Sequence, residues 1–163
     1  QIAPPFPAPQ LWQSWTVLRS MMNAGGFKTL YDKHPNDLKP ETIWEILNGR
    51  ALSVEAVYQA SVIRSRWYAH AATLFDSYDA LVLPSAQVWP FPVEWRWPQS
   101  INGHAMDTYH RWMESSIYAT FAGLPAISLP AGFNQQGLPM GLQLIGKPQG
   151  DEQLLRIAAL FTP

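Results

Sequence analysis

Residues Phe121–Phe161 read FAGLPAISLPAGFNQQGLPMGLQLIGKPQGDEQLLRIAALF, and no other part of the chain says as much about its architecture. Two short apolar runs, Ala126–Leu129 and Gly141–Ile145, each come after the tripeptide Gly-Leu-Pro. Glycine reaches dihedral angles that other residues avoid and proline fixes φ, so this tripeptide is typical of a turn before a strand. The pattern predicts two strands that are antiparallel neighbours, joined by a loop over residues 131–139.

The end of the same stretch predicts a helix. A Gly-Lys-Pro-Gln-Gly turn at residues 146–150 follows the second apolar run, and we expect Asp151 to cap a helix over Glu152–Phe161. Its apolar residues repeat at helical spacing and share one face. They are Leu154, Leu155, Ile157, Ala158 and Phe161.

Two further elements precede this stretch. Ala80–Pro84 is apolar without polar alternation, which predicts a short strand that is buried on both faces and ends at its proline. Helical spacing predicts a helix over Met106–Phe121, with Gly123 as the left-handed residue that follows it. The residues that give this spacing are Trp112, Met113, Ile117 and Phe121.

The first half of the chain reads as helical. The apolar spacing of Leu11–Met22 predicts a helix that the pair Gly25-Gly26 ends, and Pro40 begins a short helix that Gly49 stops. Ser53 is expected to cap a long helix that runs through Phe75. About three strands and five helices in this order predict an α/β layer structure.

The order of these segments resembles the C-terminal part of the amidase signature family, serine hydrolases that cleave amide bonds. The two Gly-Leu-Pro copies, the helix start Gly-Asp-Glu-Gln-Leu-Leu and the upstream segment LFDSYDALVLPSAQVWPFP at residues 74–92 carry the resemblance. It extends from Ser61 to the end of the chain, and in weaker form from Lys39. It implies the C-terminal portion of a mixed β-sheet with helices on both faces. We therefore divide the chain into residues 1–38, a Pro-rich lead and first helix that vary, and residues 39–163, part of a single amidase-type α/β domain.

The resemblance also implies catalytic groups that this chain lacks. Members of the family use a serine in a Gly- and Ser-rich run, a second serine in a cis peptide, and a lysine. The only adjacent serines here, Ser115 and Ser116, lie in the predicted helix with no glycine beside them. Glycine is needed there because a cis serine and closely approaching N–H donors demand dihedral angles that other residues adopt only with strain. We expect no catalytic residue in this chain and no activity from the segment alone.

The lysines lead to the same expectation. A lysine that acts as a base must be buried enough to lose its proton near neutral pH. All four stand in polar or turn-like surroundings: Lys28, Lys33, Lys39 and Lys147. The chain opens with the Pro-rich sequence QIAPPFPAPQ, which is typical of a connecting segment, so we expect Gln1 to be an internal beginning.

Composition excludes several classes of function. The net charge is −1 over 163 residues and the basic residues are scattered, which argues against nucleic-acid binding. No apolar run reaches the roughly 18 residues that a membrane-spanning helix needs. Cysteine is absent, which is compatible with a reducing compartment, and we expect a cytoplasmic protein.

Aromatic residues make up 13% of the chain and cluster in the segment VWPFPVEWRWP at residues 88–98. Large aromatic side chains often cover a face that would otherwise be exposed to water. Alternatively, Trp89 and Phe91 line the wall of an apolar acyl pocket, since they follow directly after a predicted strand on a proline-stiffened loop. The sequence leaves both interpretations open.

The substrate class is inferred from two positions at which this chain differs from members of the family that act on glutamine. In members that act on glutamine, an arginine and an aspartate hold the charged ends of the amino acid. Alignment by residues 46–49 and 121–123 places Trp44 or Glu45, and Met113, at those positions. A pocket walled by Met113, Ile117 and Trp89 favours an apolar or aryl acyl group instead.

Other kinds of site find little support. His104, Asp107 and His110 are spaced by three, but a further ligand at suitable spacing is missing, so we expect no metal site. His34 and His70 have no acid or nucleophile at diagnostic spacing. The resemblance implies a reaction without cofactor.

The sequence thus predicts the C-terminal segment of an amide hydrolase that acts by acyl transfer to serine. Its expected partners are a small amide substrate and either the missing N-terminal part of the same protein or a second copy, because three strands alone leave apolar sheet surface exposed. The alternative is a non-catalytic, amidase-like remnant that serves as a binding or scaffold module.

Overall fold

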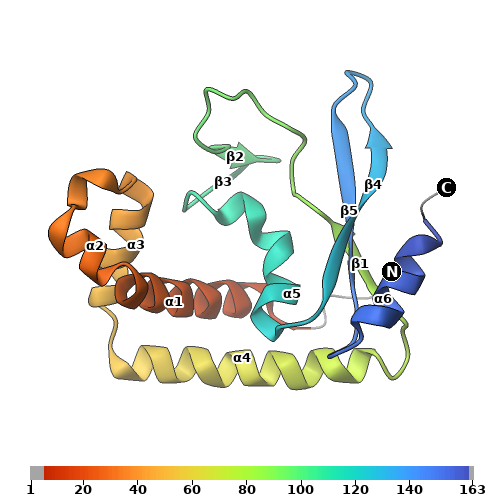
Figure 1. Ribbon diagram of the computed structural model, residues 1–163, viewed down its shortest axis with the longest axis horizontal. Coiled ribbons are helices and arrows are strands. Elements are labelled where there is room, and N and C mark those ends of the chain that lie inside the picture. The colour runs from red at the N-terminus through yellow and green to blue at the C-terminus, as the bar shows by residue number, and fades with distance from the viewer. Residues whose placement is uncertain (1–5, 162–163) are drawn as a thin grey trace. The chain divides into compact units, whose positions relative to one another are not determined.

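The computed structural model describes residues 6–161, and the chain divides into two compact units, residues 1–67 and 68–163. The first unit is helical (Figure 1). It contains α1 (Ala8–Gly26), α2 (Lys28–Lys33), the 3-10 helix η1 (Pro35–Asp37), α3 (Pro40–Arg50) and most of α4 (Val54–Leu74), which runs across the boundary. The short helix α2 was not predicted from the sequence.

Helices α1 and α3 pack closely against each other, and Gly49 makes this approach possible. A Cβ added at Gly49 would lie 2.1 Å from the carbonyl oxygen of Ser20 and 2.7 Å from Cβ of Ala24. Helix α3 ends at Arg50, one residue after the stop predicted at Gly49. The missing side chain at Gly49 also serves the packing of the two helices.

A buried carboxylate joins the same two helices. Glu45 is only 2% exposed, and its Oε1 accepts a hydrogen bond of 2.5 Å from Nε of Arg19, while Nδ2 of Asn23 donates to its Oε2. A buried carboxylate requires such partners to offset the loss of hydration. The apolar core of this unit is made of Leu11, Trp12, Ile46, Ala60, Ile63 and Trp67.

The ends of the long helices follow the sequence prediction in part. Ser53 caps α4 as predicted, since its Oγ accepts a hydrogen bond of 3.0 Å from the backbone N–H of Ala56. In contrast, α1 continues through Gly25 to Gly26. Glycine weakens a helix without forbidding it. The two glycines therefore lie inside the last turn of α1, whereas the sequence predicted that the helix would end before them.

The second unit is built on an antiparallel sheet with strand order β1-β5-β4. Its strands are β1 (Leu81–Pro84), β4 (Ala126–Phe133) and β5 (Pro139–Ile145). A small hairpin of β2 (Ser100–Ile101) and β3 (His104–Ala105), which was not predicted, stands apart from this sheet. The remaining elements are the 3-10 helix η2 (Arg111–Ser116), α5 (Ile117–Ala122) and α6 (Asp151–Ala159).

Strands β4 and β5 are antiparallel neighbours, which confirms the pairing predicted from the two Gly-Leu-Pro copies. The connection is shorter than predicted because both strands extend into the expected loop. At the hairpin tip, Oδ1 of Asn134 accepts hydrogen bonds of 2.9 Å from the backbone N–H groups of Gln136 and Leu138. Gly137 supplies the positive φ of 77° that this turn requires.

Helices cover both faces of the sheet, with α6 on one side and α5 on the other (Figure 1). The α6 side holds a buried cluster of Leu129, Leu144, Leu154 and Ala158, with Ala80, Ile127 and Ile157 packed around it. The prediction that β1 is buried on both faces is wrong, since Val82 is 53% exposed. Helix α6 packs on β4 and β5.

The segment from Met106 to Phe121 is not one continuous helix, contrary to the prediction. It is irregular up to His110, then forms η2, and becomes α-helical only at Ile117. Side chains compete with the helical backbone here: the Ser116 hydroxyl donates to the carbonyl oxygen of Met113 at 2.8 Å. Gly123 ends α5 in the left-handed conformation with φ 65°, as predicted.

The start of α6 differs from the prediction by one residue. Gly150 is the N-cap and Asp151 is the first helical residue, without a side-chain capping bond. A Cβ at Gly150 would lie 2.6 Å from Cγ of Lys147, so the tight turn before the helix disfavours a serine or aspartate at the cap. Asp151 instead places a negative charge in the first turn, where the helix dipole favours it.

Candidate functional site

A pocket of about 370 Å³ lies within the second unit, where α5 faces the sheet. Its volume is in the range that holds small-molecule ligands. Serine, threonine and glutamine side chains contribute its polar wall, and small or branched aliphatic residues contribute the rest. The lining residues among those described are Ser85, Ser116, Ala119, Thr120, Leu124, Ala126, Ile127, Ser128 and Gln143.

The sheet side of the pocket carries a pair of hydroxyl groups. Ser85 follows β1 and Ser128 lies on β4, and their Oγ atoms are 2.6 Å apart, within hydrogen-bond distance. They meet above the central strand at Gly141, whose backbone oxygen accepts a hydrogen bond of 2.9 Å from the N–H of Ser85. A Cβ at Gly141 would lie 2.7 Å from one hydroxyl oxygen and 2.9 Å from the other. Glycine at this position therefore makes room for the pair.

Gln143 adds a carboxamide to the same wall. It lies on the central strand opposite Ser128 and opposite Leu83, and it is 8% exposed. A glutamine side chain offers both a hydrogen-bond acceptor and two N–H donors. The sheet side of the pocket can thus both donate and accept.

The helical side presents hydroxyl oxygens. The hydroxyl of Ser116 donates to the carbonyl oxygen of Met113 at 2.8 Å, and the hydroxyl of Thr120 donates to the carbonyl oxygen of Ser116 at 3.2 Å. With their protons directed to the backbone, both oxygens retain lone pairs for an incoming N–H or O–H group.

Charged groups near η2 lie outside the pocket lining. Nε of Arg111 is 3.2 Å from Oε2 of Glu114. Burial raises the pKa of Glu114, Arg111 lowers it, and Asp107 raises it further. Burial also raises the pKa of Tyr118, with Glu114 adding to the effect. All described residues that line the pocket are uncharged, so its polarity comes from hydroxyl and amide dipoles.

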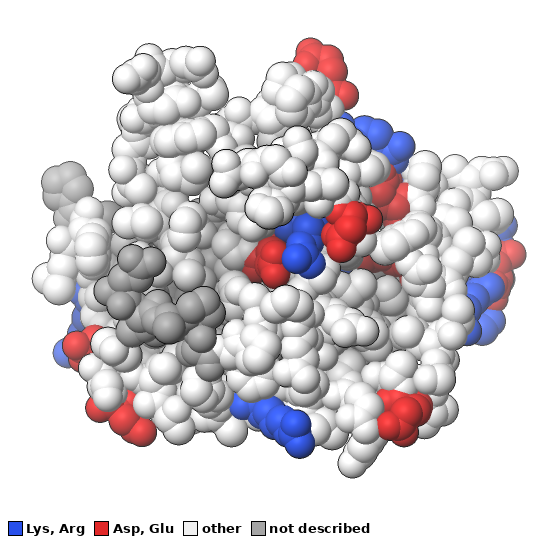
Figure 2. Space-filling model, turned by 180° about the vertical axis from the view of Figure 1, so that it is seen from behind, with Lys and Arg blue, Asp and Glu red and all other residues white. Residues whose placement is uncertain are grey.

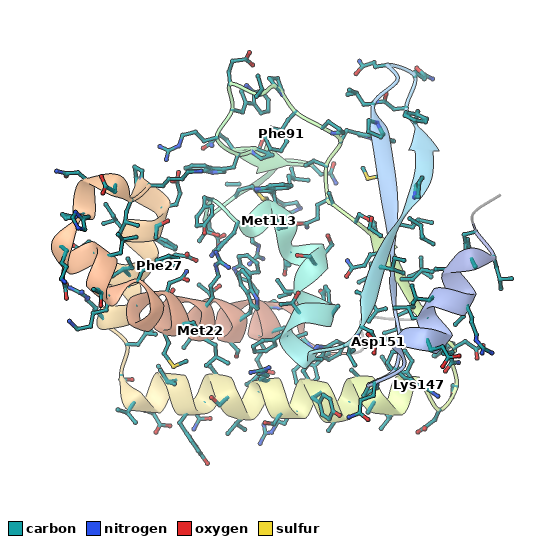
Figure 3. The ribbon with its side chains drawn as sticks, viewed as in Figure 1. Met22, Phe27, Phe91, Met113, Lys147 and Asp151 are labelled. Atoms are coloured by element: carbon teal, nitrogen blue, oxygen red, sulfur yellow. The ribbon has the colours of Figure 1, made fainter. Side chains whose placement is uncertain are left out.

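The four residues predicted to form the substrate wall differ in their packing and in their exposure to solvent. Phe91 packs against η2, with its ring edge-on to Trp112 at 5.4 Å and stacked on Trp95 at 6.3 Å. Met113 lies on η2, next to Trp112 (Figure 3). Ile117 is 2% exposed in the core, and Trp89 is 42% exposed. Among the described residues, the pocket lining contains none of the four and begins beside Ile117 at Ser116.

Sequence reasoning missed Ser85, Ser128 and Gln143. One signal was present: Ser128 interrupts the apolar run Ala126–Leu129, and Gln143 interrupts Gly141–Ile145. A polar residue inside a strand that is otherwise apolar needs a partner or a ligand when it is buried. The cross-strand meeting of Ser85 and Ser128 was not visible, since 43 residues separate them.

The residues considered for catalysis or metal binding do not assemble into a site. Ser115 and Ser116 end η2, and the buried Oγ of Ser115 makes no hydrogen bond to any described residue. His110 is fully buried, with Nδ1 2.6 Å from Oγ1 of Thr108. Within residues 6–161, no three or more histidine or acidic side chains lie close enough to hold a metal ion.

Charge is sparse on the molecular surface. In the view of Figure 2, basic and acidic side chains are scattered in small groups, some mixed and some of one sign, and no large basic patch is seen. This agrees with the net charge of −1. Among the described helices, none has the length and apolarity required to cross a membrane.

Comparisons with known proteins agree with the fold. The family model described as Amidase matches residues 16–155, so the match begins inside α1, earlier than the resemblance seen in the sequence. A glutamyl-tRNA(Gln) amidotransferase chain of Dehalococcoides mccartyi is 42% identical over 87 residues, which cover 53% of this chain and 16% of that protein. A putative amidase of Synechocystis sp. is 39% identical over 83 residues, covering 51% of this chain and 16% of its own length.

Solved structures share the fold. A bacterial aryl acylamidase of the amidase signature family superposes with a TM-score of 0.82 at 24% identity, covering 96% of this chain and 34% of that chain. A second amidase gives a TM-score of 0.83 at 20% identity, covering 93% of this chain and 35% of its own. The present chain therefore spans about a third of these enzymes and about a sixth of the curated relatives.

Proposed function

Since this chain belongs to the amidase family, we propose that it forms the scaffold and part of the substrate wall of an enzyme that hydrolyses carboxylic amides. The observation that carries the proposal is the family match over residues 16–155, together with a sheet covered by helices on both faces. No cofactor is part of this proposal.

The nucleophile of the proposed reaction comes from outside these 163 residues. Ser115 and Ser116 lie in a 3-10 helix, and the Ser116 hydroxyl is bonded to a backbone carbonyl, which is unlike an activated serine paired with a base. The curated relatives are about six times longer than the matched part of this chain, which leaves ample sequence for a glycine-embedded serine pair and a lysine.

The chemistry that follows is acyl transfer. A serine oxygen bonds to the carbonyl carbon of the amide, the C–N bond breaks, and the leaving amine takes a proton that the lysine relays through the second serine. Water then attacks the acyl-serine, which releases the carboxylic acid and restores the hydroxyl group. The present chain holds the substrate for these steps and supplies no reacting atom.

We further propose an apolar or aryl acyl group for the substrate. Met113, Ile117, Trp89 and Phe91 are the proposed wall, and the packing of Phe91 on Trp112 supports an aromatic surface beside η2. Glu45, one of the candidates for the position that binds charge in glutamine-dependent members, is already engaged by Arg19 and Asn23. This engagement argues against glutamine as the substrate.

The proposed partner of the chain is the remainder of the same protein, or failing that a second copy. Phe133 on β4 is 75% exposed and Val82 on β1 is 53% exposed, so apolar surface is open on both outer strands of the sheet. Such surface favours a covering partner. We also propose a cytoplasmic location, with which a chain free of cysteine is compatible.

The alternative is a non-catalytic binding or scaffold module. Exposed apolar residues on the loop after β1 favour it, among them Val93 at 93% and Trp95 at 54% exposure. This alternative predicts binding without turnover, even when the complete gene product is used.

Turnover measurements distinguish the proposed amide hydrolase from the binding or scaffold module. We expect the protein encoded by the complete gene to hydrolyse 4-nitroacetanilide faster than glutamine, and the present chain alone to match the rate in buffer. Absence of amide hydrolysis by the complete protein would support the binding module. A preference for glutamine would overturn the proposed acyl specificity while leaving the reaction class intact.

A further inference from the structure

Asparagine is followed by glycine at two places in the chain, Asn48-Gly49 and Asn102-Gly103. This dipeptide can react with itself, because the backbone nitrogen of the glycine can attack the side-chain carbonyl carbon of the asparagine. Glycine favours the attack, since it has no Cβ beside the nitrogen and lets the backbone turn toward the side chain. The two sites carry the same chemistry but differ in their backbone structure.

Asn102 and Gly103 form the two-residue turn between β2 and β3, where Ile101 pairs with His104. Both turn residues are exposed, with φ of 49° and 80°. Positive φ at both positions is typical of a type I′ turn, whose closing hydrogen bond is donated by the residue after the turn. Closing the turn therefore does not use the N–H of Gly103, and beyond its chain neighbours no described atom lies within 4 Å of a Cβ built there.

Asn48 and Gly49 lie within α3, where each backbone N–H donates to the carbonyl oxygen four residues earlier. The helix packs so closely on α1 that a Cβ at Gly49 would lie 2.1 Å from the carbonyl oxygen of Ser20. Asn48 is exposed, as Asn102 is, so water reaches both asparagines. The backbone at Asn48 must leave the helix before the nitrogen of Gly49 can reach the side chain.

We propose that Asn102 is a site of spontaneous deamidation, and that the isoaspartate formed there opens the β2–β3 hairpin. The backbone nitrogen of Gly103 bonds to Cγ of Asn102, the bond from Cγ to the amide nitrogen breaks, and that nitrogen leaves as ammonia with the proton of Gly103. Water then opens the resulting five-membered succinimide at either carbonyl group, which gives aspartate or isoaspartate.

The isoaspartate product changes the main chain as well as the charge. It adds one carbon atom to the backbone, and a type I′ turn fits its strands only with two residues of defined dihedral angles. Only two residue pairs hold the hairpin, Ser100 with Ala105 and Ile101 with His104. A hairpin this short has little pairing energy to offset the distortion.

The two Asn-Gly sites provide a matched comparison within one molecule. The protein encoded by the complete gene is incubated in mildly alkaline buffer, and peptide mass spectrometry follows the conversion of each asparagine. Asn102 should convert at least about tenfold faster than Asn48, because Asn48 reacts only after local opening of its helix. In urea the two sites should convert at similar rates. Equal rates in the folded protein, or an intact Asn102 after the unfolded protein has reacted, overturns the proposal.

One variant separates the added charge from the altered backbone. Asn102→Asp introduces the negative charge with a normal main chain, and Asp-Gly suits the same turn. The aged isoaspartate fraction should exchange its amide hydrogens faster over residues 99–106, where the N–H of Met106 donates to the carbonyl oxygen of Gln99 at 2.9 Å. Freshly prepared Asn102→Asp should match the unaged parent. Unchanged exchange in the isoaspartate fraction, or an equal increase in Asn102→Asp, contradicts opening of the hairpin by the isoaspartate.

Discussion

The hydroxyl oxygens of Ser85 and Ser128 lie 2.6 Å apart, although one follows β1 and the other belongs to β4, with β5 between the two strands. Strands that flank a third strand are roughly 9–10 Å apart, twice the spacing of neighbours. The two side chains bridge this distance by meeting over Gly141. The pair thus joins the two outer strands of the sheet at the wall of the pocket.

Gly141→Ala should separate this pair. The added Cβ would lie 2.7 Å from Ser85 Oγ, 2.9 Å from Ser128 Oγ and 3.2 Å from the carbonyl oxygen of Leu129. We expect the free energy of unfolding to fall by about 1–3 kcal/mol, as is usual for overpacking. Urea unfolding measures this loss. Gly25→Ala is the control, since nothing lies within 4 Å of its new Cβ, and equal effects of both substitutions would contradict the packing argument.

Gly49→Ala should disturb the contact of α1 with α3. Its Cβ would lie 2.1 Å from a backbone oxygen, which cannot move aside as a side chain can. The expected loss is at the upper end of the range of about 1–3 kcal/mol for overpacked sites. Gly26→Ala, at an open position on α1, should be neutral or stabilising because alanine favours helix more than glycine does. A variant at position 49 that keeps its unfolding midpoint would show that the helices need not approach this closely.

Glu45→Gln should destabilise the first unit by about 1–3 kcal/mol. The substitution leaves the Arg19 guanidinium without its carboxylate beside a buried side chain, and breaking such a pair costs more than breaking one in water. Glu152→Gln removes the exposed ion pair with Arg156, for which an effect below about 0.5 kcal/mol is expected. Chemical unfolding of both variants tests the contrast, and comparable losses would refute it.

Glu114 should make stability decline as pH rises. Burial raises its pKa above the usual value of 4.5, so between that value and the raised pKa the folded state binds more protons than the unfolded state. Stability must then fall with increasing pH across this window. Glu114→Gln removes the titrating proton, and the stability of this variant relative to the parent should increase as pH rises through the window.

Asp32 provides a control in the same pH series, because its effect on the pH dependence of stability is opposite to that of Glu114. Hydrogen bonds from Lys28 and Arg50 lower its pKa below 3.8, so its contribution to stability is present above that value and is lost as pH falls through the lowered pKa. The loss of stability caused by Asp32→Asn should therefore shrink toward acidic pH. If the stability of Glu114→Gln relative to the parent instead falls as pH rises, as for Asp32→Asn, the proposed effect of burial is wrong.

Short sequence patterns correctly predicted the features that depend on residues close together in the chain. The Ser53 cap, the left-handed Gly123 and the pairing of β4 with β5 all follow from short-range chemistry of serine, glycine and proline. The prediction of one helix over Met106–Phe121 was wrong because it used only the spacing of apolar residues. It took no account of the Ser116 hydroxyl, which bonds to the backbone and favours a tighter turn.

The candidate pocket depended on contacts that local patterns do not contain. Ser85 and Ser128 are 43 residues apart, and only the strand order brings them to one place. The role of Gly49 in packing likewise depends on Ser20 of another helix, so the sequence suggested a helix stop but not the close contact. The aromatic residues singled out from composition remain a proposed wall.

The most direct measurement is to locate the reactive serine in the protein encoded by the complete gene. A fluorophosphonate probe reacts with activated serines, and peptide mass spectrometry identifies the labelled residue. We expect the label on a glycine-flanked serine outside these 163 residues, and no label on the present chain alone. Labelling of Ser115, Ser116 or any other serine within these residues would contradict the assignment of the chain as scaffold and substrate wall.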